Sequence, residues 1–455
     1  MMGALMLTQV LWGLMAQAEP SPPTTPITGW EPSRTWVTIA SVMKWKDPAL
    51  DDFDTRRRKD LVLDERFALR GVPDAQRALL IDNDATKHTV VHAVGRQVQA
   101  APPGSTFIFY FQGHGVFDDT HRFVMTTTET RVEDAAQTGL TLADLFAVYA
   151  LRGPRDRVIL LSDACYSGHL GDLAVALNAL GVPALALTSA DARAESSENW
   201  TFTQALIDAL EGRTLVDKDG DGRVRLSELA EEARLAMRHR EGQPISFTRP
   251  RVDLKDLELG PARPLSDPIN GPDVDALEPR GAHFGRGDWV LATRLAGERS
   301  VARVLGAKTE DGKPTRLRVE YYDFTDRLYA WAREDLVDPI LFEEWPVGAD
   351  LRVLDDGEAL RATVKIADHG LHLVSYVGYA ATEDEYVAPD QILGPWDARD
   401  ERERVLVSRG STLQEAVIKG RFLDRVCVRF RGSSWLDDRC VQASRVRQLR
   451  HGGSP

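Results

Sequence analysis

The chain has 455 residues, of which 43% are hydrophobic and 27% are charged, and its formal net charge is −13 at pH 7. This composition is that of a globular protein, and the length is sufficient for more than one domain. The acidic balance argues against nucleic acid binding as the main function, so no nucleic acid partner is predicted.

The N-terminus is apolar and uncharged over its first 18 residues, a stretch shorter than a typical transmembrane helix. The sequence Ala-Gln-Ala precedes Glu19 in the small-x-small pattern of a secretory cleavage site. We therefore predict a signal peptide over 1–18, a Pro-rich linker over 19–34, and an exported protein, periplasmic or extracellular, with no membrane span in its mature chain. The alternatives are a poorly ordered leader and a lipid-facing anchor, and a retained segment would indicate an intracellular regulator.

Short apolar strands alternate with helical patterns from residue 35 to residue 259. The predicted strands are 35–42, 77–82, 105–113, 157–163 and 183–190. Continuous apolar strands separated by helices indicate a buried, mostly parallel sheet with helices on both faces. The fold class predicted for this part is therefore α/β.

Two reactive side chains follow strands of this predicted sheet. His114 stands between two glycines directly after the strand at 105–113, and Cys165 follows the next strand. Ligands bind beyond the carboxyl ends of parallel strands, so both side chains are expected at one sheet edge. A nearby histidine and a helix N-terminus, here expected at Ser167 or Gly168, lower the pKa of a thiol and favour its nucleophilic form. Each residue alone is more often structural, since a buried cysteine packs as a small hydrophobe.

A strand followed by GHG and a later strand followed by DACYSG resemble the caspase/metacaspase superfamily of cysteine peptidases. Cys165 lies 51 residues after His114, near the spacing of about 50 residues in caspases. The resemblance covers 35–259 and implies Cys165 as nucleophile and His114 as general base and acid. The backbone N–H groups of Gly115 and Cys165 would form the oxyanion site, and the reaction would pass through a thioester acyl-enzyme.

Asp163 precedes Ala-Cys, where the caspase signature has glutamine. This departure is similar to metacaspases, in which an acidic residue selects Arg or Lys at substrate position P1, through charge-assisted pairing. Ser189, Asp191 and Glu195 follow the next strand, in the region of the family's substrate groove, and are expected to line the same pocket. Tyr166 stands where metacaspases commonly have His, a departure that bears on the P1 preference.

A second motif, DKDGDGRVRLSE at 217–228, matches the calcium-binding loop of an EF-hand. The expected ligands are the side chains of Asp217, Asp219, Asp221 and Glu228, and the backbone carbonyl of Arg223. The sequence contains no second such loop to pair with it, so Ca²⁺ is predicted to act as a structural brace more than as a switch. The alternative is an acidic, solvated turn, and no organic cofactor is predicted.

A linker rich in Pro, Gly and Asp follows at 260–281, and the pattern changes beyond it. A weak repeat of short strands and turns, with a period of roughly 55–60 residues, is long enough for a small barrel in each unit. We predict three all-β barrels at 282–340, 341–396 and 397–450. Their alternation and aromatic residues resemble Tudor or agenet-type SH3-like barrels, with an unknown ligand.

Aromatic residues recur at matching places in these units. They are Tyr321, Tyr322, Phe324, Tyr329, Trp331, Tyr376, Tyr379, Tyr386, Phe430 and Trp435. In Tudor-like barrels such residues can form a cage for a cation, although packing in the barrel core is the more common role.

Cys427 and Cys440 flank a segment with the pattern of a strand, a turn and a strand. In an exported protein they could form a cross-strand disulfide, worth about 3 kcal/mol for so short a loop. The alternative is two unpaired core cysteines. Pairing these two leaves Cys165 as the remaining thiol.

The favoured interpretation is an exported, calcium-binding, caspase-like cysteine endopeptidase that acts on protein or peptide substrates. The rival interpretation is a non-catalytic scaffold, in which an inert caspase-like domain and the Tudor-like barrels hold a protein partner.

Overall fold

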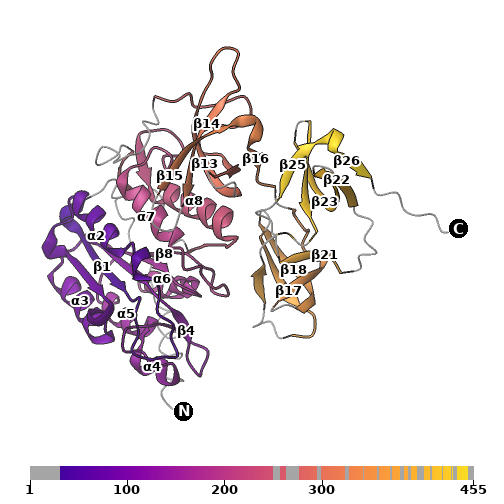
Figure 1. Cartoon of the computed structure of the whole chain (residues 1–455). Coiled ribbons are helices and arrows are strands. Elements are labelled where there is room, and N and C mark those ends of the chain that lie inside the picture. The colour runs from indigo at the N-terminus through magenta and orange to yellow at the C-terminus, as the bar shows by residue number, and fades with distance from the viewer. Residues whose placement is uncertain are drawn as a thin grey trace. The chain divides into compact units, whose positions relative to one another are not determined.

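The computed structural model describes residues 31–248, 257–262, 276–294, 299–322, 327–341, 343–355, 358–368, 371–379, 384–387, 391–396, 404–409, 412–422, 424–431, 433 and 438–448. The predicted signal peptide, most of both predicted linkers, Phe324 and Trp435 lie outside these residues. The chain divides into two compact units, which Figure 1 shows in one view. The first runs to Arg234 and includes Ile245–Leu265, and the second comprises Leu235–Pro244 and Ser266–Pro455.

The first unit is built on a six-stranded sheet with the order β10-β8-β7-β3-β1-β2. Its strands are β1 (Thr35–Ser41), β2 (Arg77–Ile81), β3 (Thr106–Gln112), β7 (Arg157–Asp163), β8 (Ala184–Thr188) and β10 (Ser246–Thr248). All neighbouring pairs are parallel except β10 and β8. The prediction of a mostly parallel α/β sheet is confirmed, and β10 is an antiparallel edge strand that the sequence pattern did not indicate.

Helices cover both faces of this sheet (Figure 1). The helices of the first unit are α2 (Asp60–Leu69), α3 (Lys87–Ala100), α4 (Ala135–Thr138), α5 (Leu142–Tyr149), α6 (Leu170–Ala179), α7 (Thr201–Glu211) and α8 (Leu226–Ala236), the last of which continues into the second unit. Helices α3, α5 and α6 pack on one face, where Phe107, Phe109 and Phe111 of β3 form the centre of the main core. Burial of each such ring contributes about 1.5–3 kcal/mol. Among the described residues, no helix combines the length and apolarity that a membrane span requires.

Successive side chains of β3 and β7 point to opposite faces of the sheet, and the two faces have different surroundings. Phe111 faces the main core, whereas Tyr110 and Gln112 face the side of α2 and α7, because successive strand residues point to opposite faces. Asp163, the in-register neighbour of Gln112, lies on the same side. Its carboxylate accepts a hydrogen bond from the Thr203 hydroxyl of α7. This second face is therefore polar at its carboxyl edge.

Smaller elements complete the first unit. A three-stranded sheet with the order β4-β5-β6 follows the carboxyl end of β3, and a two-stranded sheet pairs β9 with β11. The bounds are β4 (Gly115–Phe117), β5 (Phe123–Met125), β6 (Leu140–Thr141), β9 (Arg223–Arg225), β11 (Glu258–Pro261), and the 3-10 turns η1 (Pro32–Arg34), η2 (Thr55–Arg57), η3 (Asp74–Gln76), η4 (Asp82–Asp84), η5 (Val132–Asp134) and η6 (Ser167–His169).

The second unit contains three five-stranded sheets, each antiparallel and each with its own apolar core. The first sheet has the strands β12 (Trp289–Thr293), β13 (Arg299–Lys308), β14 (Arg316–Tyr322), β15 (Arg327–Arg333) and β16 (Asp338–Pro339). The second has β17 (Asp350–Asp355), β18 (Glu358–Asp368), β19 (Leu371–Tyr376), β20 (Glu385–Val387) and β21 (Ile392–Pro395). The third has β22 (Arg404–Arg409), β23 (Thr412–Phe422), β24 (Arg425–Phe430), β25 (Arg439–Gln442) and β26 (Val446–Gln448). The predicted series of small β domains is confirmed, and the resemblance to Tudor barrels stays a prediction.

Within its described residues, this unit has the helical turns η7 (Met237–Glu241), η8 (Glu334–Leu336) and η11 (Ala443–Arg445).

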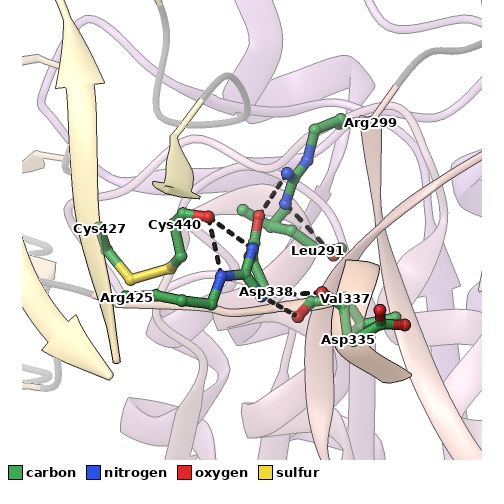
Figure 2. Close-up of a disulfide and its surroundings, with 8 residues drawn as sticks. All are labelled: Leu291, Arg299, Asp335, Val337, Asp338, Arg425, Cys427 and Cys440. Atoms are coloured by element: carbon green, nitrogen blue, oxygen red, sulfur yellow. Dashed lines mark hydrogen bonds and ion pairs between the residues drawn. A yellow bond between two sulfur atoms is a disulfide. The ribbon is translucent and has the colours of Figure 1, made fainter. Parts of the chain in front are cut away.

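Cys427 and Cys440 face each other in register on β24 and β25 and form a disulfide (Figure 2). Arg425, two residues before Cys427, donates to the Cys440 carbonyl oxygen and forms an ion pair with Asp338 of the first sheet. Asp338 is 1% exposed and also pairs with Arg299. One buried carboxylate thus joins two arginines from the first and third sheets, as Figure 2 shows.

Among the described aromatic residues of the second unit, some pack in the cores and others lie near arginine side chains. Tyr321 and Tyr376 are buried in their cores. Trp331 is exposed, and the guanidinium groups of Arg316 and Arg318 lie 5.5 and 5.6 Å from its ring centroid. A cation already lies over this ring, and it belongs to the same chain.

Candidate functional site

Three strands of the main sheet end in register on its carboxyl edge. Ser41, Gln112 and Asp163 are the last residues of β1, β3 and β7, and each pairs with the next across the sheet. The loop after β3 carries His114, and the loop after β7 carries Cys165. The two candidate catalytic residues therefore leave neighbouring strands at one edge of the sheet, as expected.

His114 is half-buried between two aromatic side chains. Its ring centroid lies 4.4 Å from that of Trp45 and 4.3 Å from that of Phe53. Its Nε2 atom lies 2.9 Å from the carbonyl oxygen of Asp51. Because a carbonyl oxygen only accepts, Nε2 carries the proton, and the neutral ring keeps its lone pair on Nδ1. None of these three neighbours was predicted from the sequence. The two rings come from the segment between β1 and η2, whose path the residue pattern does not indicate, and a backbone acceptor has no signature in residue types.

The Cys165 thiol contacts the backbone of Ser196 instead of His114. The Ser196 N–H donates to Sγ at 3.2 Å, and Sγ lies 3.7 Å from the Ser196 carbonyl oxygen. Burial raises the pKa of the Cys165 thiol above its ordinary value; the Ser196 N–H opposes this shift, and the charges of Glu195 and Asp163 add to it. In the described residues, no hydrogen bond joins Cys165 to His114.

The expected lowering of the Cys165 pKa by a helix N-terminus is wrong for this arrangement. Ser167–His169 form a 3-10 turn, and α6 begins only at Leu170. Tyr166 has φ 55° and turns the chain between Cys165 and η6. The first turn of the α-helix is therefore displaced from the thiol, and the dipole effect decreases steeply beyond that turn.

The raised pKa predicts slow alkylation of Cys165 at neutral pH. We expect the rate of labelling by iodoacetamide to rise with pH and to reach half its maximum above about pH 8.5, the ordinary pKa of cysteine, because the thiolate is the nucleophile. Cys427 and Cys440 are joined in the disulfide, so mass spectrometry of the unreduced protein should find one label. A half-maximal rate well below pH 8.5 would show that a positive charge, such as protonated His114, controls the thiol.

Gly115, the first residue of β4, lies directly against the Cys165 backbone. A Cβ atom on Gly115 would lie 2.0 Å from the Cys165 carbonyl oxygen and 2.8 Å from a ring carbon of Phe123. No side chain fits there, so the two backbones can approach closely. An oxyanion site built from the N–H groups of Gly115 and Cys165 needs this proximity.

Asp163 and Ser189 belong to one buried polar cluster beside Cys165. Oδ2 of Asp163 accepts hydrogen bonds from Thr203 N–H at 3.0 Å and from Thr203 Oγ1 at 2.6 Å. The Ser196 hydroxyl lies 2.8 Å from Ser189 Oγ and 3.5 Å from Asp163 Oδ1. Neither Thr203 nor Ser196 was predicted from the sequence, because residue types do not reveal which turn of α7, or which residue of the loop before it, faces the sheet edge.

The other two residues of the predicted pocket lie farther out. Glu195 is exposed, and its carboxylate accepts a hydrogen bond from the Tyr166 hydroxyl at 2.9 Å. The Asp191 carboxylate accepts from the N–H of Arg193 within its own turn. Glu195 therefore lies one residue from the segment that covers Cys165. Among the described residues, the contacts of Asp191 include no hydrogen bond to Asp163 or Cys165.

The acidic loop at 217–228 brings three carboxylates together. One oxygen from each of Asp217, Asp219 and Asp221 lies within 4.8 Å of the others. Gly222 has φ 82°, and its N–H donates to Asp217 Oδ2 at 2.9 Å, so the chain makes the sharp turn that glycine permits. The donors are hard oxygen atoms, which suit Ca²⁺.

Glu228 closes this loop from the first turn of α8. Its carboxylate accepts from the N–H groups of Lys218 at 2.7 Å and Arg225 at 2.8 Å. The Arg225 guanidinium forms ion pairs with Asp219 and Asp221. Arg223 pairs through its side chain with Glu258 of β11. The strand β11 pairs with β9 in the antiparallel two-stranded sheet, so this ion pair joins the loop to β11.

No protein-family model matches this chain, and no curated protein matches it. Solved structures with a similar fold include protein GSU0716 from Geobacter sulfurreducens, with a TM-score of 0.36 and 16% identity over 49% of this chain and 97% of that chain. Caspase-1 from Spodoptera frugiperda has a TM-score of 0.31 and 9% identity over 48% and 84% of the two chains. The Drosophila initiator caspase Dronc has a TM-score of 0.32 and 11% identity over 51% and 86%. At these identities, the likenesses do not determine what the site binds or cleaves.

Proposed function

We propose that the first unit is a cysteine endopeptidase that cleaves protein or peptide substrates after Arg or Lys. The observation that carries the proposal is the convergence of His114, Cys165 and buried Asp163 at the ends of the paired strands β3 and β7. A thiol, an imidazole with an oriented lone pair and a carboxylate in one place suit acyl transfer from a basic residue.

The imidazole of His114 is oriented for proton transfer. Its Nε2–H donates to the Asp51 carbonyl oxygen, so Nδ1 is the atom that accepts the thiol proton. The resulting thiolate attacks the substrate carbonyl carbon, and the oxyanion faces the N–H groups of Gly115 and Cys165. The C–N bond then breaks as Nδ1–H protonates the departing amine, leaving a thioester on Cys165. A water molecule, deprotonated by the same nitrogen, hydrolyses this thioester and regenerates the thiol.

The preference for a basic P1 side chain rests on Asp163. Its carboxylate is buried beside the nucleophile, where pairing with a guanidinium or ammonium group is much stronger than in water. Ser189 adds a hydroxyl to the same cluster, and Glu195 adds a second negative charge near Cys165. Substrate entry requires the contact between Cys165 and Ser196 to break.

Replacement of Cys165 by alanine tests the proposal. We expect complete loss of cleavage of peptides with Arg or Lys at P1, and loss of iodoacetamide labelling of the native protein. Far-UV circular dichroism of the variant controls for folding. Full activity of Cys165→Ala would contradict the assignment.

The observation that favours the rival scaffold is the engagement of Cys165 by Ser196 in place of His114. In a scaffold this contact would be permanent, and the second unit would bind the protein partner. An unreactive Cys165 in the folded wild type, together with no turnover of a positional peptide library, would favour this reading.

We further propose that the loop at 217–228 binds Ca²⁺ through Asp217, Asp219, Asp221, Glu228 and the Arg223 carbonyl. The ion would displace the guanidinium of Arg225 from the aspartates and brace the connection between α7 and α8. We expect Ca²⁺ at 100 times its dissociation constant to stabilise the first unit by about 2.7 kcal/mol. Chemical denaturation with and without Ca²⁺ measures this, and Glu228→Gln should remove most of the effect. Equal denaturation midpoints with and without Ca²⁺ would contradict the proposal that this loop binds the ion.

We also propose export to an oxidising compartment, which the disulfide between Cys427 and Cys440 supports. N-terminal sequencing of the expressed protein tests this, because cleavage of the predicted signal peptide would leave Glu19 as the first residue.

A further inference from the structure

The strands β14 and β15 have an outer face, opposite to the core of the first sheet in the second unit. Leu317 and Val319 of β14 point into that core. Arg316 and Arg318 alternate with them, so they point outward, because successive strand residues face opposite sides. The two strands are antiparallel neighbours (Figure 1), and Trp331 of β15 is the in-register neighbour of Arg318. Trp331 therefore lies on the same outer face.

Two aromatic rings of β15 hold the Arg318 guanidinium on this face. Its central carbon lies 5.9 Å from the ring centroid of Tyr329 and 5.6 Å from that of Trp331. A cation is attracted to an aromatic ring at this range, because the face of the ring is negative. These contacts orient the flat guanidinium before a ligand arrives, so a ligand that pairs with it loses less conformational entropy.

The N–H groups of Arg318 are available for a ligand. A guanidinium has five donors, and those of Arg318 make no hydrogen bond or ion pair with any described residue.

Arg316 has one distant acceptor, since its Nη2 atom lies 3.5 Å from Glu310 Oε1. Two lysines contact the same carboxylate more closely, Lys313 at 2.6 Å and Lys308 at 3.0 Å. These contacts lower the pKa of Glu310 to about 2, so its carboxylate is ionised and already neutralised by the lysines. The Arg316 side chain is 44% exposed and keeps donors for a further acceptor.

The charge around these arginines is opposite in sign to that of the whole chain. From 308 to 318 the sequence has four basic and two acidic residues, whereas the chain carries a net charge of −13. Glu320, the next residue of β14 on this face, is buried and has Arg303 as its in-register neighbour. The exposed part of the outer face thus suits an anionic ligand, and its Trp331 ring is already occupied by cations of the chain itself.

The spacing of the two arginines defines the shape of that ligand. Arg316 and Arg318 are two residues apart on one strand, which places their Cα atoms about 6.8 Å apart. An extended peptide along β14 has the same period, and its alternate side chains face one side. Carboxylates at positions i and i+2 of the peptide can therefore meet both guanidinium groups, each through two parallel N–H groups.

We propose that the outer face of β14 and β15 binds an extended acidic peptide with carboxylates at alternate positions, which pair with Arg316 and Arg318 beside the Trp331 ring. This inference does not rest on the proposed peptidase function of the first unit. It also differs from what the resemblance to Tudor barrels implies, which is a cationic ligand in an aromatic cage.

Two fluorescently labelled peptides of equal length test the proposal. Each has three glutamates among serines, at every second position in one peptide and at every third position in the other. In an extended backbone the second spacing puts neighbouring glutamates on opposite faces. Fluorescence anisotropy with the full chain should show that the alternating peptide binds about fivefold more tightly, the upper end for one exposed ion pair. Arg318→Met should abolish this preference.

Arg96→Met is the matched control, because it removes the same charge from another surface. Arg96 is exposed on α3 and makes no hydrogen bond or ion pair with another described residue. Its affinities for both peptides should equal those of the wild type. Arg318→Lys keeps the charge but removes the fork of donors, so its preference should also fall toward one, and it replaces Arg318→Met if that variant does not fold.

Equal affinities of the wild type for the two peptides, or an unchanged preference in Arg318→Met or Arg318→Lys, would overturn the proposal. A trimethyl-lysine peptide that displaces the alternating peptide would overturn it in favour of a cationic ligand. A single-stranded oligonucleotide that binds more tightly than the alternating peptide, and loses affinity in Arg318→Met, would overturn it in favour of a nucleic acid.

Discussion

Replacement of Gly115 by alanine is expected to lower kcat/KM toward peptides with Arg at P1 by about 100-fold or more, the loss that accompanies removal of one oxyanion donor. The added methyl carbon would lie 2.0 Å from the Cys165 carbonyl oxygen, a distance that the backbone can relieve only by moving apart. The two N–H groups would then no longer face the same point. Initial rates on the Arg peptide measure the effect.

A second glycine provides the control. Gly95 lies within α3, and a Cβ built on it meets no atom within 4 Å. Gly95→Ala should leave the rate unchanged and stabilise the helix by up to about 1 kcal/mol. Wild-type activity in Gly115→Ala would show that the backbone of this loop does not take part in the reaction.

Replacement of Asp338 by asparagine is expected to destabilise the second unit by about 3 kcal/mol, the lower end of the range for breaking a buried ion pair. Asp338 is buried, and its carboxylate balances both Arg299 and Arg425. The value lies at the lower end because both arginines keep backbone acceptors, Leu291 for Arg299 and Cys440 for Arg425. Equilibrium unfolding in denaturant measures the change.

Asp335 is the matched control for this experiment. It lies three residues away, and its ion pair with Arg333 is exposed, with each side chain about half accessible. Asp335→Asn should change the stability by less than about 0.5 kcal/mol, because exposed ion pairs contribute little. Equal effects of the two substitutions would show that the burial of Asp338 is not what makes it important.

The strands of the main sheet were predictable because each is a continuous apolar run between polar turns. The strand β7 has the bounds expected for it, Arg157–Asp163, and β3 differs from its prediction by one residue at each end. The location of the two loops that carry His114 and Cys165 then followed from a general rule, since parallel sheets carry their functional loops at the carboxyl edge. For the same reason, His114 and Cys165 could be placed together without knowledge of any contact.

The electrostatic environment that sets the pKa of the Cys165 thiol could not be predicted from the sequence. It depends on the Ser196 backbone, which comes from a loop 31 residues beyond Cys165, and on a 3-10 turn where the pattern suggested an α-helix. Backbone groups such as the Asp51 carbonyl have no signature in residue types.

The contact between Cys165 and Ser196 has a kinetic consequence. If reagents reach Sγ only after this contact opens, labelling is a two-step process of opening followed by chemistry. The observed rate should then increase with reagent concentration at first and approach a plateau equal to the opening rate. Mutations that loosen the 194–196 segment would raise this ceiling without changing the chemistry of the thiol. The height of the plateau then measures how often the resting protein exposes Cys165.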